Sequence, residues 1–193
     1  FMKVIQLHQE EKQLIMLAIE NNRQAQQQIY AKFSSKMLSV CRQYIKDIHH
    51  AEDVMITGFM KVFTNLKNFE HKGSFEGWIR RIMVYECIDF LRVKKNNFNH
   101  QDIDDVTVSE NESVYEMEDF SVDDIQNMID NLPDGYKMVF NLYAIEGYKH
   151  QEIAEMLKIS EGTSKSQLSH ARKLLQQQIT ELKNKLNDIA TIR

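Results

Sequence analysis

Residues that break secondary structure are scarce in this chain. Pro133 is the only proline among 193 residues, and only six glycines accompany it. Average usage is about 5% proline and about 7% glycine. An all-β protein needs turn residues every few positions, so this composition argues against one. The sequence therefore predicts an all-α fold.

Apolar residues recur at helical spacing in the N-terminal half. One predicted helix face consists of Phe33, Met37, Cys41, Tyr44 and Ile48. A second face consists of Met55, Phe59, Val62, Phe63 and Leu66. This spacing of three to four residues is typical of an amphipathic helix. After a break at 72–74, a third helix is expected from Phe75 to about Lys95, with Ser74 as its N-cap.

Charged residues divide the chain into blocks. Residues 1–95 carry fifteen Lys/Arg against ten Asp/Glu, residues 96–136 carry twelve acids and no base, and residues 137–193 carry nine bases against six acids. The acidic, weakly apolar stretch 96–121 predicts a flexible linker between two small helical domains, 1–95 and 122–193. Basic blocks favour polyanion partners, although a solubilising loop between ordinary domains is the alternative.

Pro133 is expected to open a helix in the C-terminal part. Proline suits the first helical position because its missing N–H would have no partner there. Gly147 is the residue expected to end this helix. The apolar and aromatic residues that follow Pro133 in the expected helix are Tyr136, Val139, Phe140 and Tyr143.

The stretch 151–172 has the pattern of a helix-turn-helix. Ala154 is small enough to let two helices cross closely, residues 158–160 form the expected turn, and Ser160 is the expected N-cap of a helix from about Glu161. Such a helix fits the major groove of DNA, where polar and basic side chains reach bases and phosphates. A helical hairpin with a solvated face is the alternative. The predicted outward face consists of Lys165, Ser166, Gln167, Ser169, His170, Arg172 and Lys173.

Signals of catalysis, cofactor binding and membrane insertion are missing from the sequence. Cys41, Cys87 and the seven histidines form no metal or redox motif, and neither a Gly-rich phosphate loop nor a nucleophile motif occurs. We therefore expect no enzyme, no cofactor and no metal. No stretch approaches the roughly 18 apolar residues of a membrane span, and no signal-peptide pattern opens the chain. The chain is expected to be cytoplasmic, without direct membrane insertion.

Three groups of motifs follow one another along the chain. The first is Ala51-Glu52-Asp53-Val54 with 59–63, the second is Gly73-Ser74-Phe75-Glu76-Gly77-Trp78 with 79–82 and 88–92, and the third is Asn131-Leu132-Pro133 with 152–154 and 162–172. Together they make the chain, from about residue 14 to 180, resemble the extracytoplasmic-function (ECF) sigma factors of bacterial RNA polymerase. Those are two-domain, all-helical proteins that direct the polymerase to selected promoters.

The resemblance implies three partners and assigns residues to two of them. Core RNA polymerase is expected to bind through the clamp helices of its largest subunit and the flap of its second-largest subunit. Promoter DNA is the second partner and an anti-sigma factor the third. The residues implied for clamp binding are Glu52, Asp53, Ile56, Phe59 and Met60. Those implied for the minus-ten element are Phe69, His71, Lys72, Ser74, Arg80, Arg81, Tyr85 and Arg92. The outward face listed above is implied for the minus-thirty-five element.

Some positions depart from the family pattern. Ile56 stands in place of the usual Gln and Tyr85 in place of a frequent Asn, whereas Ser164 replaces Val and Gln167 replaces Arg. Gln prefers adenine edges where Arg prefers guanine, so the recognised promoter is expected to differ. Trp78 is a candidate for stacking on an extruded base, but its spacing favours a core position.

Two other functions remain compatible with the sequence. One is a sigma-like decoy that sequesters an anti-sigma factor without binding polymerase. The other is a stand-alone helix-turn-helix regulator, which leaves the motifs in 51–92 unexplained.

Overall fold

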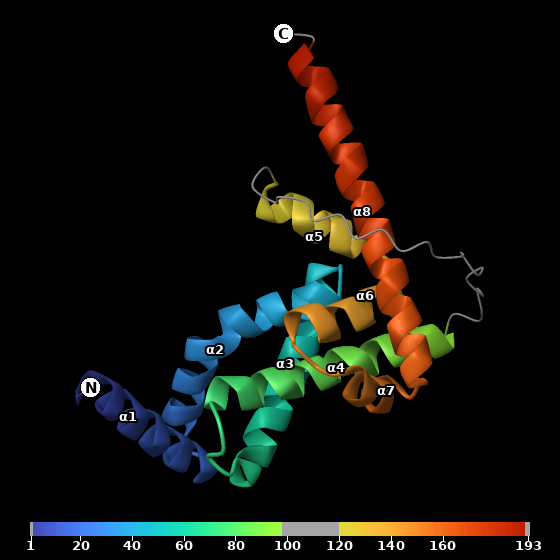
Figure 1. The fold of residues 1–193 in the computed structure, drawn as a ribbon. Coiled ribbons are helices and arrows are strands. Elements are labelled where there is room, and N and C mark those ends of the chain that lie inside the picture. Colours follow the sequence, from blue (N-terminus) through green and yellow to red (C-terminus); the bar gives the residue numbers. More distant parts are fainter. Residues whose placement is uncertain (1, 98–119, 192–193) are drawn as a thin grey trace. The chain divides into compact units, whose positions relative to one another are not determined.

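The computed structural model of the protein describes residues 2–97 and 120–191, and every regular element in these ranges is helical (Figure 1). The all-α prediction is therefore confirmed for this part of the chain. The chain forms two compact units that divide between Val93 and Lys94. Most of the predicted linker, 96–121, lies outside the described residues, so its flexibility stays a prediction.

The described residues of unit 1 form α-helices and one short 3-10 helix. They are α1 (Met2–Ile19), α2 (Arg23–Tyr44), α3 (Ile48–Asn65), η1 (Leu66–Asn68) and α4 (Phe75–Asn97), which continues past the division at Val93. Their inward faces form one apolar core in which aromatic rings meet edge to face, such as Phe33 with Phe75 at 5.7 Å between ring centroids. Fully buried residues of this core include Ile15, Ile29, Met37, Val40, Tyr44, Val62, Leu66, Ile79 and Met83.

Side-chain caps fix where these helices begin. Ser74 accepts a hydrogen bond of 3.0 Å from the backbone N–H of Gly77, which confirms its expected role at the start of α4. The prediction that one helix continues to Ile48 is wrong, because α2 ends at Tyr44. Asp47 caps the next helix by accepting a hydrogen bond of 2.9 Å from the backbone N–H of His50. Ile48 is consequently exposed at the start of α3.

Gly58 lies where α3 packs against α4. A Cβ atom at this position would overlap the sulfur of Met83 and lie 3.0 Å from its terminal methyl group. Met83 is fully buried, so a larger residue at position 58 would force the end of its side chain into a new position inside the core. Glycine costs about 1 kcal/mol of helix propensity but leaves Met83 its place at this crossing.

Unit 2 consists of α5 (Val122–Asp130), α6 (Asp134–Phe140), a π-helical turn η2 (Asn141–Ile145), α7 (His150–Leu157) and α8 (Glu161–Thr191). Pro133 occupies the N-cap of α6 instead of its first helical position, a difference of one residue. Gly147, with φ of 77°, follows the π-helical turn in the left-handed conformation expected at a helix end.

A buried ion pair lies between α5 and α6. Asp130 and Lys137 are each almost inaccessible, and the carboxylate oxygen and ammonium nitrogen are 4.0 Å apart. Gln126 donates a hydrogen bond of 3.3 Å to the same carboxylate. Further along, Gln178 of α8 donates to the backbone carbonyl of Met128, which connects α8 to α5.

The helix-turn-helix is present as predicted. Lys158 ends α7 in the left-handed conformation, with φ of 56°. Ser160 then accepts a hydrogen bond of 2.9 Å from the backbone N–H of Thr163 and caps α8. Leu168 and Ala171 are buried on the inward side of α8.

Tyr143 lies in the π-helical turn and is 37% exposed, whereas Asn141 and Leu142 beside it are fully buried. The backbone N–H of Glu146 donates to the carbonyl of Asn141, an i to i+5 bond that places an extra residue in this turn.

Candidate nucleic-acid and protein interfaces

The exposed side of α3 combines two apolar and two acidic residues. Ile56 and Met60 are exposed one helical turn apart, Met60 by 66%, and Glu52 and Asp53 are exposed on the preceding turn. An apolar pair beside carboxylates suits a partner with an apolar surface flanked by basic groups.

Phe59 is not part of this exposed surface. Its side chain is only 2% exposed, and its ring contacts Tyr30 at 4.8 Å and Phe63 at 6.1 Å between centroids. Phe59 lies one turn from Met55 on the inward face, as the helical spacing predicts. We therefore remove it from the candidate partner-binding residues.

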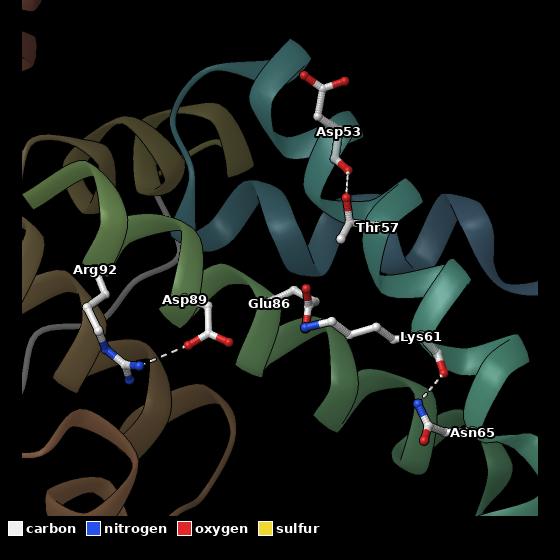
Figure 2. Close-up of polar contacts among 7 residues, drawn as sticks. All are labelled: Asp53, Thr57, Lys61, Asn65, Glu86, Asp89 and Arg92. Carbon is white, nitrogen blue, oxygen red and sulfur yellow. Dashed lines mark hydrogen bonds and ion pairs between the residues drawn. The ribbon is translucent and has the colours of Figure 1, made fainter. Parts of the chain in front are cut away.

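Three polar side chains of α3, those of Thr57, Lys61 and Asn65, follow one another at intervals of one helical turn (Figure 2). Thr57 and Asn65 donate to carbonyl groups of their own helix, at 2.9 and 2.8 Å. Lys61, between them, instead pairs with Glu86 of α4. Among the seven residues drawn, this ion pair is the only link between the two helices.

The loop between η1 and α4 carries several of the predicted minus-ten residues. His71, Lys72 and Ser74 are exposed, and His71 and Gly73 have positive φ values of 56° and 94°. Lys72 pairs with Glu70 at 2.6 Å. The loop therefore presents polar groups on a sharply turned backbone.

Phe69 belongs to the core at the base of this loop. Its ring is buried and contacts Phe75 at 5.1 Å and Trp78 at 5.5 Å between centroids. Direct contact between Phe69 and a partner is therefore not supported by its position. Trp78 is half-buried against the same rings, in agreement with a core role.

The outward side of α4 presents basic and aromatic groups. Arg81 and Tyr85 are exposed, and the guanidinium carbon of Arg81 lies 5.8 Å from the centre of the Tyr85 ring. Arg92 pairs with Asp89 at 3.0 Å, whereas Arg80 is half-buried nearer the start of the helix. A guanidinium above a ring is an arrangement that can also accept a stacked base.

The predicted outward face of α8 is divided between solvent and α6. Lys165, Ser166 and Arg172 are exposed, while Ser169 and Lys173 are half-buried. The Gln167 amide lies next to Gly135, since a Cβ there would be 3.3 Å from its nitrogen. His170 stacks on Tyr136, with ring centroids 5.4 Å apart. Gln167 and His170 therefore flank the solvent-facing part of α8, and neither lies at its centre.

Glu161 lies beside the basic residues of α8. Its carboxylate pairs with Lys165 at 2.7 Å. The hydrogen bond from Lys165 lowers the pKa of Glu161 below its ordinary value of 4.5. This exposed pair is expected to open readily when a stronger anion approaches Lys165.

The sequence analysis did not single out His150, which the structure places in contact with α8. Its Nδ1 shares a hydrogen bond of 2.9 Å with the hydroxyl of Ser164, which is fully buried. The only signal was the presence of Ser164 where the family usually has Val. A buried hydroxyl needs a partner, but the sequence does not say which residue supplies it.

The described residues offer no group of three or more His, Cys, Asp or Glu arranged for a metal ion. Within the same part of the chain, no helix is long and apolar enough to cross a membrane.

Comparison with known proteins identifies both units. The family model described as Sigma-70 region 2 matches residues 29–97, and the model described as Sigma-70, region 4 matches residues 122–175. Together the matched segments make up more than half of the chain.

This chain aligns with most of the length of two curated relatives. The ECF RNA polymerase sigma factor SigW of Bacillus subtilis is 29% identical over 163 residues, which are 78% of this chain and 86% of SigW. The ECF RNA polymerase sigma-E factor of Haemophilus influenzae is 24% identical over 169 residues, which are 80% of this chain and 87% of that protein.

A solved structure shows the same fold. It is the sigma factor RpoE in complex with the anti-sigma factor NepR from Bartonella quintana. The TM-score is 0.53 at 18% identity, and the match covers 80% of this chain and 96% of the other. With both sigma regions matched in order and this fold in common, the chain belongs to the ECF sigma factor family.

Proposed function

We propose that this chain is a promoter-specificity subunit, which binds core RNA polymerase in the cytoplasm and directs transcription initiation to selected promoters. The observation that carries this proposal is the presence of both sigma regions, in order, in one chain. Bond-making chemistry belongs to the polymerase, and the chain contributes binding and positioning without catalysis.

The exposed side of α3 is the proposed docking surface for the polymerase clamp helices. Ile56 and Met60 pack on the apolar edge of these clamp helices, while Glu52 and Asp53 face their basic groups. The exposure of all four side chains supports this assignment.

The proposed contacts with the minus-ten element come from α4 and the loop before it. Arg80, Arg81 and Arg92 face the DNA backbone, and Tyr85 offers its ring to an unstacked base. His71, Lys72 and Ser74 contribute polar groups from the loop. Stacking on an aromatic ring is worth about 1–3 kcal/mol, which offsets much of the cost of unstacking one base.

The proposed contacts with the minus-thirty-five element come from α8, whose unit also meets the polymerase flap. Lys165, Ser166, Ser169 and Lys173 lie toward the groove. Gln167 and His170, which lie against α6, reach only its edge. An anti-sigma factor is proposed as the regulator that covers these surfaces, as family membership implies.

A pair of matched variants tests the docking surface. Met60→Glu places a charge on the proposed surface, and Met16→Glu places the same charge on α1, where the methionine is similarly exposed, at 62%. We expect Met60→Glu to weaken binding to core polymerase at least tenfold, about 1.4 kcal/mol, and Met16→Glu to have little effect. Equal effects of the two variants would contradict the assignment of the surface.

Binding experiments with the wild-type chain distinguish the promoter-specificity subunit from the decoy and the stand-alone regulator. Binding to core polymerase, followed by promoter-dependent RNA synthesis, supports the proposal. Binding to an anti-sigma factor without binding to core polymerase would instead indicate a decoy. Tight promoter binding that core polymerase does not improve would indicate a stand-alone regulator.

A further inference from the structure

Four side chains form a continuous chain of contacts across the helix-turn-helix. Ser164 of α8 hydrogen-bonds His150 at the start of α7, at 2.9 Å. The His150 ring stacks on Tyr143 of η2, with centroids 4.6 Å apart and planes inclined by 21°. The guanidinium carbon of Arg172, two turns along α8 from Ser164, lies 5.7 Å from the centre of the Tyr143 ring.

Ser164, at the buried end of this series of contacts, holds a fixed position. Ser164 is fully buried, so its hydroxyl has little freedom to exchange its partner for water. The hydrogen bond therefore holds the His150 ring against the first turns of α8. His150 in turn restricts the ring of Tyr143 by stacking on it.

Tyr143 belongs to the π-helical turn, which the i to i+5 bond from Glu146 to Asn141 closes. Its ring is 37% exposed and meets both His150 and Arg172. Turns of this kind are frequent at functional sites.

At the exposed end of this series of contacts lies the cation of Arg172. Arg172 lies on the solvent side of α8, and its long side chain would otherwise sample many rotamers. A ring beneath the guanidinium reduces this freedom while its N–H groups remain available to an anion.

We infer that Tyr143 and His150 are positioning residues that hold Arg172 ready for a phosphate of the DNA duplex recognised by α8. The inference rests on the proposed function, because it assumes that α8 binds promoter DNA. It distinguishes a phosphate-binding Arg172 from one that only braces the fold.

The test measures how promoter binding by the holoenzyme depends on salt. The probe is a duplex promoter fragment recovered from a random library transcribed by the wild-type holoenzyme. A phosphate contact adds about one unit to the slope of log K against log salt concentration. We expect Arg172→Ala and Tyr143→Ala each to lower the slope by about one unit. The double variant is expected to equal either single variant, because both remove the same contact.

Two further variants separate positioning from folding. Tyr143→Phe keeps the ring and is expected to keep the wild-type slope. Ile145→Ala removes another exposed apolar side chain of the same turn, which is 39% exposed, and is also expected to keep it. Thermal unfolding of each variant shows whether it is folded, and Tyr143→Leu replaces Tyr143→Ala if the latter unfolds.

The inference and the proposed function fail in different ways. If the wild-type holoenzyme binds no promoter, the proposed function is rejected and the inference with it. If the wild type binds, and Tyr143→Ala leaves the slope unchanged or adds to the effect of Arg172→Ala, only the inference is overturned.

Discussion

Lys61 of α3 and Glu86 of α4 form an ion pair whose two members differ sharply in exposure. Figure 2 shows the two side chains meeting between the helices. The Glu86 side chain is 9% exposed and the Lys61 side chain 50%. Lys61 therefore supplies the charge that compensates a carboxylate removed from water. The pair joins the helix proposed to bind polymerase to the helix proposed to bind the minus-ten element.

Replacing Lys61 with Met tests this ion pair. The variant leaves the Glu86 carboxylate buried without its ammonium partner, and we expect the free energy of unfolding of unit 1 to fall by about 1–3 kcal/mol. Urea unfolding of the full chain measures it. The control is Lys67→Met, at an exposed position of η1, with an expected change within about 0.5 kcal/mol. Similar losses in both variants would show that Glu86 does not depend on Lys61.

Replacing Gly58 with Ala tests the close approach of α3 and α4. Alanine gains about 1 kcal/mol of helix propensity, but overpacking against Met83 costs about 1–3 kcal/mol. We expect a net loss of stability in urea unfolding. Gly162→Ala is the control, because a Cβ there lies 3.6 Å from the Ser160 hydroxyl, an ordinary contact. A stabilised Gly58→Ala variant would contradict the packing described here.

The cap formed by Asp47 is expected to make α3 less stable in acid. The backbone hydrogen bond from His50 lowers the pKa of Asp47 below its ordinary value of 3.8. The unfolded chain therefore takes up this proton at a higher pH than the folded chain. The stabilisation is present above about pH 4 and is lost as the pH falls through the lowered pKa.

Asp47→Asn keeps a capping oxygen but removes the titrating group. We expect the wild type to exceed this variant in stability near neutral pH, and the difference to shrink below about pH 4. Urea unfolding across this pH range measures the difference. Asp53→Asn, which removes the same charge from an exposed position of α3 away from the cap, is the control for the loss of a charge on this helix. A constant difference for Asp47→Asn would refute the prediction.

Because Asp130 and Lys137 form a buried ion pair, we expect replacing one of them to lower the free energy of unfolding more than replacing both. Lys137→Met removes the ammonium partner of the buried Asp130 carboxylate, which keeps its hydrogen bond from Gln126, and is expected to cost about 3–5 kcal/mol in unfolding free energy. The double variant Asp130→Leu/Lys137→Met removes both charges and should recover most of that loss. Equal instability of the single and double variants would mean that packing, and not charge, dominates this position.

Local signals in the sequence were sufficient for much of the fold. The caps at Ser74 and Ser160 and the left-handed Gly147 follow from residue type and position, and the structure confirms each of them. The boundary at Asp47 was missed although Asp is a favoured N-cap, because the apolar spacing continues through Ile48. Periodicity alone cannot show that two consecutive helices change direction there.

The site was predicted less completely, for two physical reasons. Phe59 and Phe69 are apolar residues that suit either a core or a partner, and only the packed structure shows that both rings are buried. The contact between His150 and Ser164 joins residues 14 positions apart. It depends on how the turn at residues 158–160 places α8 against the start of α7, for which the sequence carries no clear signal.

Start-site mapping tests the central claim most directly. Core RNA polymerase is incubated with a random promoter library, with and without this chain, and the 5′ ends of the transcripts are sequenced. The account predicts new start sites that share upstream elements near minus ten and minus thirty-five and that appear only with the chain. Start sites identical in both reactions, under conditions where the chain is folded and in excess, would contradict it.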